Sequence, residues 1–500
     1  MAAAQKPSRD KYLSSVRKSL FVQLADSYVG LVLQIISAAI IARLLSPTEI
    51  GIFAVAAVLF SMASQFRDFG LGEYLIQEKE LTNEKIRAAF AGNVIVSWMM
   101  ATLLVFASWR VGEFYRQPGV GEIMRLQAVN FLIVPFGAVT MAYFRRELAY
   151  KPIFIASLAA NLVSFAVAVG SAFSGLSYMS MAWSSLAGLV VTVAVSMWFR
   201  PAGFPRWPAL QGLLEVIQFS KHAMGIYFFG QIGRSAPEAV IGKALDMASV
   251  AFFSRANGLM EIFNRTVLRA ALPICLPYFA KSARAGESTV PGYLQATQLL
   301  TGAGWPFFFV IGILSFSTIR LLYGQQWADA VGLAQILCLV AAIELPYWLA
   351  KEVIIAVGRI DQANRMQFWV QGLRLLSLTL VFPFGLLGVC WGLVGSALVG
   401  CCVAHRFLRQ AIEIHVIDIL RACAPSGLVA AATALMPMLA AILIPQTELN
   451  YVAFLVFGGA ASAIMWLLSL WAVKHAFWIE IRNIVASITT RWRARQPTSR

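Results

Sequence analysis

Long runs of apolar residues, each close to the length of a membrane crossing, recur along the whole chain. Two examples are "AGNVIVSWMMATLLVFASW" (Ala91–Trp109) and "LVAAATALMPMLAAILI" (Leu428–Ile444). A helix needs roughly 20 apolar residues to cross a bilayer, and a soluble domain could not bury so many such runs. Only 13% of the 500 residues are charged, against about a quarter in an ordinary soluble domain. The sequence therefore predicts an all-α polytopic membrane protein.

The apolar runs divide into about 14 transmembrane helices. The predicted spans lie near residues 19–43, 48–70, 87–109, 122–143, 153–174, 178–199, 222–243, 248–271, 293–318, 329–350, 366–384, 386–407, 422–444 and 450–473. The glycines Gly70 and Gly72 follow no strand, so we interpret them as the end of a helix and not as a phosphate-binding loop.

The distribution of Lys and Arg orients these spans. If the N-terminus is cytoplasmic, roughly 28 of the 40 Lys and Arg residues fall in cytoplasmic segments and about six in periplasmic loops, as the positive-inside rule requires. We therefore expect both termini in the cytoplasm. The net charge of +16 then reflects orientation and attraction to anionic lipid headgroups, and nucleic-acid binding is not expected.

An internal repeat relates the two halves of the chain. The segment "IARLLSPTEIGIFAVA" (Ile41–Ala56) aligns with "IGKALDMASVAFFSRA" (Ile241–Ala256) at an offset of 200, and later spans recur at offsets of roughly 205–215. Each half then holds six helices, so the repeats are parallel, an arrangement of transporters that places the substrate path between the lobes. We predict lobes at residues 1–210 and 211–415, followed by two additional helices and a basic tail at 416–500.

Cofactor and metal sites are not expected. The six cysteines lie in or beside apolar segments without CxxC spacing, and the chain has only four histidines, which disfavours a zinc site or a disulfide framework. No GxxxxGK[ST] motif for ATP binding occurs in the sequence, so direct use of ATP is not expected.

Charged and polar side chains fall inside several spans, where they usually face a partner or a cavity. Arginines outnumber carboxylates among them, which favours an anionic or phosphate-bearing substrate, since the guanidinium fork binds phosphate oxygens bidentately. Each of these residues could equally well form a structural pair. The candidate substrate-binding residues are Arg234, Arg255, Arg265, Arg269, Arg374 and Gln371.

Two carboxylates are candidates for coupling transport to an ion gradient. Asp26 lies a few residues inside the first span, and Glu344 has no obvious basic neighbour in the sequence. By contrast, Glu238 and Glu261 have arginines four residues away, which should hold them ionised and make them poorer proton carriers.

The block "AAIIARLLSPTEIGIFAVAAVLFSMASQFRDFGLGEYLIQ" (Ala38–Gln77) resembles the start of the polysaccharide-transport family of Wzx-type flippases, in the multidrug/oligosaccharidyl-lipid/polysaccharide exporter superfamily. The similar positions are Ala42–Pro47, Gly51, Asp68–Gly72 and Leu75–Gln77. In the second half, Phe253–Ala256 is similar to the family's aromatic-Ser-Arg-Ala step.

The resemblance implies a bacterial inner-membrane transporter, not an enzyme. Such a flippase moves undecaprenyl-pyrophosphate-linked oligosaccharides by alternating access for exopolysaccharide, capsule or O-antigen (lipopolysaccharide) synthesis. Its implied partners are a polysaccharide polymerase and a chain-length regulator. Two alternatives stay open. A cation-coupled small-molecule exporter of the same superfamily is disfavoured by the arginines. A membrane glycosyltransferase or polymerase is disfavoured by the short outside loops, of which the longest, Arg110–Gly121, has about a dozen residues.

Overall fold

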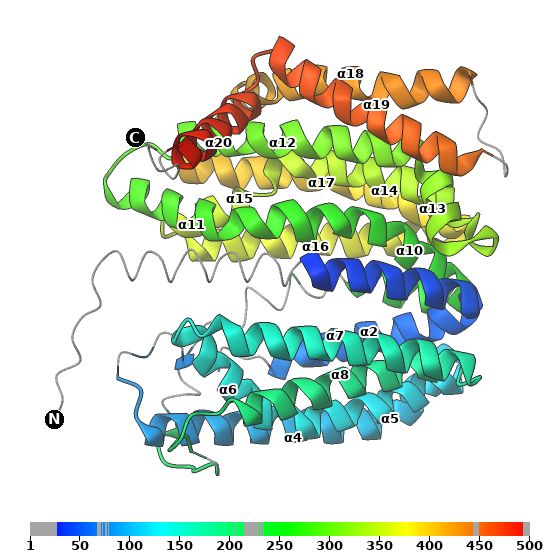
Figure 1. Cartoon of the computed structure of the whole chain (residues 1–500), viewed down its shortest axis with the longest axis vertical. Helices are drawn as coiled ribbons and strands as arrows, with labels where there is room; N and C mark the ends of the chain where they lie inside the picture. The colour runs from blue at the N-terminus through cyan, green and yellow to red at the C-terminus, as the bar shows by residue number, and fades with distance from the viewer. Residues whose placement is uncertain are drawn as a thin grey trace, which may run out of the picture. The chain divides into compact units, whose positions relative to one another are not determined.

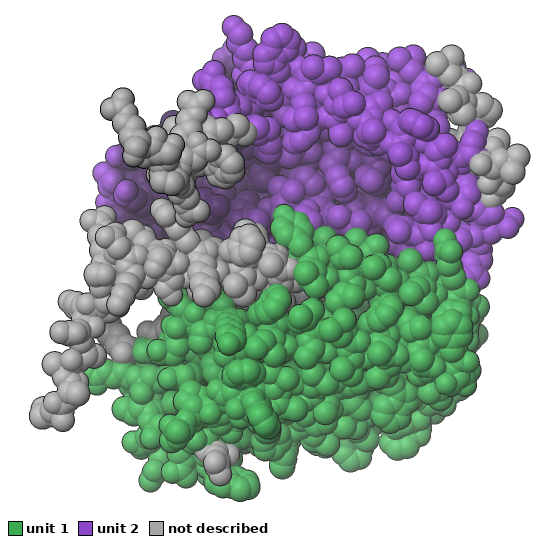
Figure 2. Space-filling view, in the orientation of Figure 1, with its two compact units in different colours: residues 1–251 green, residues 252–500 purple. Residues whose placement is uncertain are grey.

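The computed structural model describes residues 28–67, 72, 74–75, 78, 80–205, 207–214, 230, 233, 235–443 and 450–493. Every regular element among them is a helix, as the apolar runs predict (Figure 1). The chain forms two compact units, Met1–Ala251 and Phe252–Arg500 (Figure 2).

Unit 1 begins, within the described residues, with the apolar helix Tyr28–Leu44. The helices that follow are α2 (Pro47–Arg67), α4 (Asn83–Tyr115), α5 (Pro118–Ile133), α6 (Pro135–Arg146), α7 (Tyr150–Phe173) and α8 (Met179–Trp198).

Unit 2 contains most of α10 (Met247–Phe263) and everything after it. Its elements are the π-helical turn η1 (Asn264–Leu268), α11 (Arg269–Arg284), α12 (Val290–Ile313), α13 (Ser315–Tyr323), η2 (Gln325–Trp327), α14 (Ala330–Glu344), η3 (Leu345–Tyr347), α15 (Ala350–Ala356), α16 (Ile360–Val381), η4 (Phe382–Phe384), α17 (Gly385–Ile412), α18 (Val416–Leu443), α19 (Tyr451–Ala472) and α20 (Ala476–Arg493).

The predicted number of fourteen spans is not confirmed. In the described part of the chain, nine helical segments are long and apolar enough to cross a membrane, or ten if the bent pair α5–α6 is one span. One of the nine, Ile360–Ile412, contains both α16 and α17, which pack against each other. Residues 19–27 of the predicted span near 19–43 and half of the predicted span near 222–243 fall outside the described residues.

A polar network at the start of α2 holds one end of unit 1. Ser46 and Glu49 form a capping box, in which the N–H and Oγ of Ser46 each donate to Glu49 Oε2 at 2.7 Å. Ser177, in the turn between α7 and α8, donates to the other oxygen of Glu49. Its neighbour Tyr178 donates to Glu122 of α5 at 2.9 Å. The starts of α2, α5 and α8 therefore lie at the same end of this unit.

Arginines hold the opposite end of unit 1. Arg146, the last residue of α6, donates through Nη1 to the carbonyls of Leu75 at 2.7 Å and Glu78 at 2.5 Å. Arg87, near the start of α4, donates to the Trp207 carbonyl at 3.3 Å. The loop after α2, the start of α4, the end of α6 and the segment after α8 thus lie together. The Lys and Arg distribution predicts this end to be cytoplasmic.

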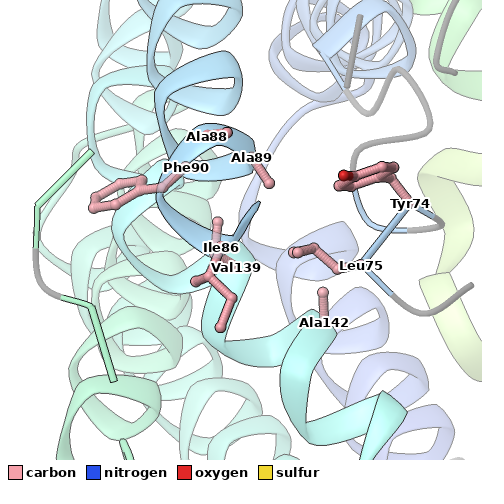
Figure 3. Packing of buried hydrophobic residues seen from close by; sticks show 8 residues of the cluster. All are labelled: Tyr74, Leu75, Ile86, Ala88, Ala89, Phe90, Val139 and Ala142. Atoms are coloured by element: carbon pink, nitrogen blue, oxygen red, sulfur yellow. The ribbon is translucent and has the colours of Figure 1, made fainter. Parts of the chain in front are cut away.

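The chain after α2 is anchored by apolar packing (Figure 3). The helix ends at Arg67. Gly70 lies outside the described residues and Gly72 is itself helical, so the interpretation of these glycines as a helix end stays a prediction. Beyond it, Tyr74 and Leu75 are buried, 5% and 2% exposed. They belong to one cluster with residues of α4 (Ile86, Ala88, Ala89 and Phe90) and of α6 (Val139 and Ala142).

A proline breaks corresponding helices in the two halves. The axis bends by 55° between α5 and α6, where Pro135 has no N–H to offer the preceding turn. In unit 2, Pro346 lies in the 3-10 turn η3, between α14 and α15. The two prolines are 211 residues apart (346 − 135), which agrees with the offsets of the predicted repeat.

Tryptophans bind the carbonyls that these breaks expose. Trp305 Nε1 of α12 donates at 2.8 Å to the carbonyl of Ala342, four residues before Pro346, which an unbroken helix would have bonded internally. Trp98 Nε1 of α4 donates at 3.4 Å to the carbonyl of Leu132. A buried carbonyl without a donor is costly, so Trp305 has a structural function and is not a free surface for stacking on sugars.

The helix caps at the starts of α2 and α10 also agree with the predicted offset of 200. Asp246 accepts the N–H of Ser249 at 2.8 Å at the start of α10, as Ser46 does with Glu49 at the start of α2. The two helix starts are in close contact, because a Cβ built on Gly51 would lie 1.7 Å from the Met247 carbonyl oxygen. Only glycine fits at residue 51 without a shift of the backbone.

The C-terminal helices are tied to α12 by a buried polar chain. His475, between α19 and α20, is 1% exposed, and its Nδ1 accepts the N–H of Phe477 at 3.1 Å. The proton of the neutral ring is therefore on Nε2, which donates to Ser426 Oγ of α18 at 3.0 Å. Ser426 donates in turn to the Gln298 carbonyl of α12 at 3.2 Å. Burial lowers the pKa of His475 below its usual value of 6.5.

A first prediction concerns topology. A reporter fused after Ser177 should report the periplasm, because that turn lies at the end of unit 1 that carries Glu49 and Glu122. A reporter after Gly203 should report the cytoplasm, as should one at Arg500, and one at Gln446 should report the periplasm. Alkaline phosphatase and green fluorescent protein fusions measure this directly. Inverted results at any two of these positions would contradict the orientation.

A second prediction concerns the pH dependence of stability. Because the pKa of His475 is lower in the folded than in the unfolded state, its contribution is complete above about pH 6.5 and is lost as the pH falls through the folded value. We expect the Tm of the purified protein to drop between about pH 7.5 and 5.5, and His475→Gln to drop less. The control is His415→Gln, at an exposed histidine. Identical pH profiles for the parent and both variants would contradict the assignment.

Candidate functional site

The structure describes six of the eight sequence-predicted site residues, and all six lie in unit 2. They are Arg255, Arg265, Arg269, Gln371, Arg374 and Glu344. Asp26 and Arg234 lie outside the described residues.

Two of the predicted arginines converge on one carboxylate. Arg265 Nε and Arg269 Nη2 both lie 3.1 Å from Glu261 Oε1. The second oxygen of Glu261 accepts a hydrogen bond from Asn264 Nδ2 at 2.8 Å. The expectation that Glu261, Arg265 and Arg269 share one helix face is confirmed.

A π-helical turn makes this convergence possible. Residues Asn264–Leu268 form η1, between α10 and α11. Eight residues of a regular α-helix would carry Arg269 about 12 Å along the axis from Glu261, whereas the wider π turn shortens that rise. Such turns occur often at functional sites. The predicted span 248–271 is thus helical, but it is interrupted in the middle of its charged face.

Glu261 has two guanidinium partners that stay partly accessible. The side chain of Arg265 is 38% exposed and that of Arg269 is 63% exposed. Arg265 also has a further interaction besides this ion pair. The accessible guanidinium of Arg269 can bind a phosphate group while it keeps its pair with Glu261.

Glu344 has a basic partner that the sequence does not reveal. Arg374 Nη2 of α16 forms a salt bridge with Glu344 Oε1, at the end of α14. The side chain of Arg374 is 17% exposed and that of Glu344 is 40% exposed. The expectation that Glu344 lacks a basic neighbour is therefore corrected, because the two residues meet through the packing of different helices, 30 positions apart in the sequence.

Gln371 lies one turn before Arg374 on α16. Its Nε2 donates to Gln367 Oε1 at 3.2 Å, while its own Oε1 is buried without a hydrogen-bond partner. An unpaired buried oxygen is costly, and a hydroxyl or amide of a ligand could satisfy it. Gln371, Arg374 and Glu344 thus form a second polar group in unit 2.

Arg255 lies apart from both groups, in an aromatic setting. Its guanidinium carbon is 5.3 Å from the ring centroid of Tyr323, in α13, and 5.5 Å from that of Trp327, in η2. Its Nε is buried without a hydrogen-bond partner. Cation–π contacts of this kind stabilise a guanidinium away from water, so the structure gives Arg255 a packing function.

Sequence reasoning missed several of these features. The part played by Asn264 and the π turn had no recognisable signal in the sequence. The aromatic partners of Arg255 lie about 70 residues further along the chain. In the described part of the chain, no group of three or more His, Cys, Asp and Glu side chains could hold a metal ion.

Comparison with known proteins gives a family match over more than half of the chain. A family model described as "Polysaccharide biosynthesis protein" matches residues 40–332. This range includes the capping box at Ser46, the π turn at Asn264–Leu268 and the arginines around Glu261.

Two curated relatives match most of the chain. The succinoglycan biosynthesis transport protein ExoT of Rhizobium meliloti is 25% identical over 378 residues, covering 75% of this chain and 74% of the relative. The teichuronic acid biosynthesis protein TuaB of Bacillus subtilis is 24% identical over 400 residues, covering 77% of this chain and 80% of the relative.

The fold is that of a solved lipid flippase. The lipid II flippase MurJ, in an inward closed conformation, superposes with a TM-score of 0.69 over 91% of this chain and 99% of that protein, at 11% sequence identity. At this identity the likeness concerns the fold.

A third prediction concerns the group around Glu261. If a phosphate binds the accessible guanidinium of Arg269, Arg269→Ala should lower transport by roughly tenfold. Arg269→Lys should retain more activity, because charge survives while bidentate geometry is lost. The measurement is transport at matched protein levels. Arg284→Ala is the control, since Arg284 is an exposed arginine at the end of the same helix.

The outcomes separate the functions of charge and geometry. Equal losses for Lys and Ala would assign Arg269 a purely geometric function. Full activity of the Ala variants at both Arg265 and Arg269 would contradict a substrate contact at this group.

Proposed function

We propose that this chain, which belongs to the polysaccharide biosynthesis protein family, is a flippase that carries lipid-linked oligosaccharides across the membrane by alternating access. The observation that carries the proposal is the match to this family over residues 40–332, together with the fold of a lipid flippase. The chain is a multi-pass membrane protein and a transporter, not an enzyme.

The arginines of unit 2 support a substrate that carries phosphate. The accessible guanidiniums of Arg265 and Arg269 suit the pyrophosphate of an undecaprenyl-pyrophosphate-linked oligosaccharide. A small-molecule exporter that takes cations would not favour accessible arginines at this position. The proposal gives a substrate-binding function to Arg234, Arg265, Arg269, Gln371 and Arg374, and leaves out Arg255, whose guanidinium packs against Tyr323 and Trp327.

The same proposal covers location, lobes and partners. We place the chain in the bacterial inner membrane with both termini in the cytoplasm, since the Lys and Arg distribution favours this orientation. Its transport lobes are residues 1–210 and 211–415, and residues 416–500 add two helices and a basic tail. A polysaccharide polymerase and a chain-length regulator would act on the exported unit to make exopolysaccharide, capsule or O-antigen.

Coupling to an ion gradient is assigned first to Asp26. The alternative carboxylate, Glu344, forms a salt bridge with Arg374.

A fourth prediction tests transport and coupling together. Membrane vesicles containing the purified chain and a labelled undecaprenyl-pyrophosphate oligosaccharide should move the lipid between leaflets faster under an imposed proton or sodium gradient. Asp26→Asn should remove that dependence on the gradient. The double variant Glu344→Gln/Arg374→Gln removes both partners of one ion pair, so it should keep the dependence.

Each contrary outcome contradicts a different part of the proposal. Absence of any movement of the labelled lipid in the parent would contradict the flippase function. Transport that ignores both gradients would contradict carboxylate coupling alone. Loss of gradient dependence in the Glu344→Gln/Arg374→Gln variant, with Asp26→Asn unaffected, would transfer the coupling function to Glu344.

A further inference from the structure

A pocket at the end of α17 carries chemistry that the transport proposal does not use. The cavity has a volume of about 460 Å³, and the described residues that line it are His405, Arg406, Arg409 and Gln410. The spacing of these residues places His405 with Arg409, and Arg406 with Gln410, one helical turn apart on the same face. Ligand sites in proteins have volumes of roughly 300–1,000 Å³.

The pocket is strongly basic. Two guanidiniums and an imidazole line it, and its described lining contains no carboxylate. The two guanidiniums therefore give the described lining of the pocket a positive charge.

Basic residues near a helix C-terminus often do no more than compensate its exposed carbonyls. Here Arg359, which precedes α16, donates through Nη1 to the Gln410 carbonyl. That carbonyl of the last turn therefore already has a cationic partner from outside the helix, and Arg406 and Arg409 are not needed for it.

One ring nitrogen of His405, a residue that lines the pocket, has no hydrogen-bond partner. Its Nδ1 is buried without a partner, while its ring packs edge-on against Tyr347, with centroids 6.0 Å apart. A buried polar atom without a partner is costly.

We propose that His405, Arg406, Arg409 and Gln410 form an anion site for a phosphate group at the cytoplasmic end of α17. Paired guanidiniums bind phosphate oxygens bidentately, and Gln410 adds an amide donor. Two sources share this chemistry, the headgroup of an anionic phospholipid and a soluble phosphate compound. Basic pockets between membrane helices on the cytoplasmic side bind lipid headgroups of this kind.

The test measures binding to the purified full-length protein and does not depend on transport. One arm titrates inorganic pyrophosphate into the protein in nanodiscs of neutral phosphatidylcholine. The other arm counts retained cardiolipin by native mass spectrometry after reconstitution in phosphatidylcholine with increasing cardiolipin. The variant is Arg406→Gln/Arg409→Gln. The control is Arg284→Gln/Arg421→Gln, which removes the same charge from exposed arginines.

We expect the pocket variant to weaken binding of one probe at least about tenfold and the control to change it less than about twofold. His405→Gln should weaken the same probe by a smaller factor. An effect on pyrophosphate identifies a soluble ligand, and an effect on cardiolipin identifies a lipid headgroup. Equal loss in pocket variant and control, or no binding of either probe to the parent, would overturn the proposal. A melting curve for each variant ensures that the compared proteins are folded.

Discussion

The cost of placing charge at membrane depth is the constraint on which the arrangement of unit 2 depends. An isolated charge there is unfavourable by several kcal/mol, so charged residues must find partners or face water. The structure meets this demand in different ways. Arg265 and Arg269 share Glu261, Arg374 pairs with Glu344 across two helices, and Arg255 packs against aromatic rings. Among these described arginines, Arg269 has the most accessible side chain, 63% exposed, which is why the group around Glu261 is the best candidate for contact with an anionic headgroup.

Backbone polar groups obey the same constraint. A proline that interrupts a membrane helix frees a carbonyl, and a broken helix is tolerated where another group satisfies it. Trp305 does this for the carbonyl of Ala342, and Trp98 donates to Leu132 at the corresponding break in the first half. A proline break and a tryptophan donor thus recur together in the two halves, whereas a bend is present between α5 and α6.

Local features could be predicted from the sequence, and long-range pairings could not. The helical class follows from the apolar runs, and the starts of α2 and α10 at Pro47 and Met247 agree with the repeat offset of 200. The shared face of Glu261 and Arg265 follows from helical periodicity. The pair of Glu344 and Arg374 depends on how α14, α16 and α17 pack, which no spacing rule describes. The π turn that begins at Asn264 shifts the register of one helix. A prediction from helical periodicity assumes a constant register and therefore misses it.

The most direct test of the flippase account is to find the leaflet in which the lipid-linked oligosaccharide accumulates when this chain is removed from cells that make the polysaccharide. Spheroplasts from a depletion strain are labelled with a membrane-impermeant reagent that reacts with sugars on the outer leaflet. The account predicts that the intermediate accumulates and stays unlabelled until the membrane is permeabilised, and that re-expression of the chain makes it accessible. Labelling of the accumulated intermediate in intact, depleted spheroplasts to the same extent as in the parent would contradict the account.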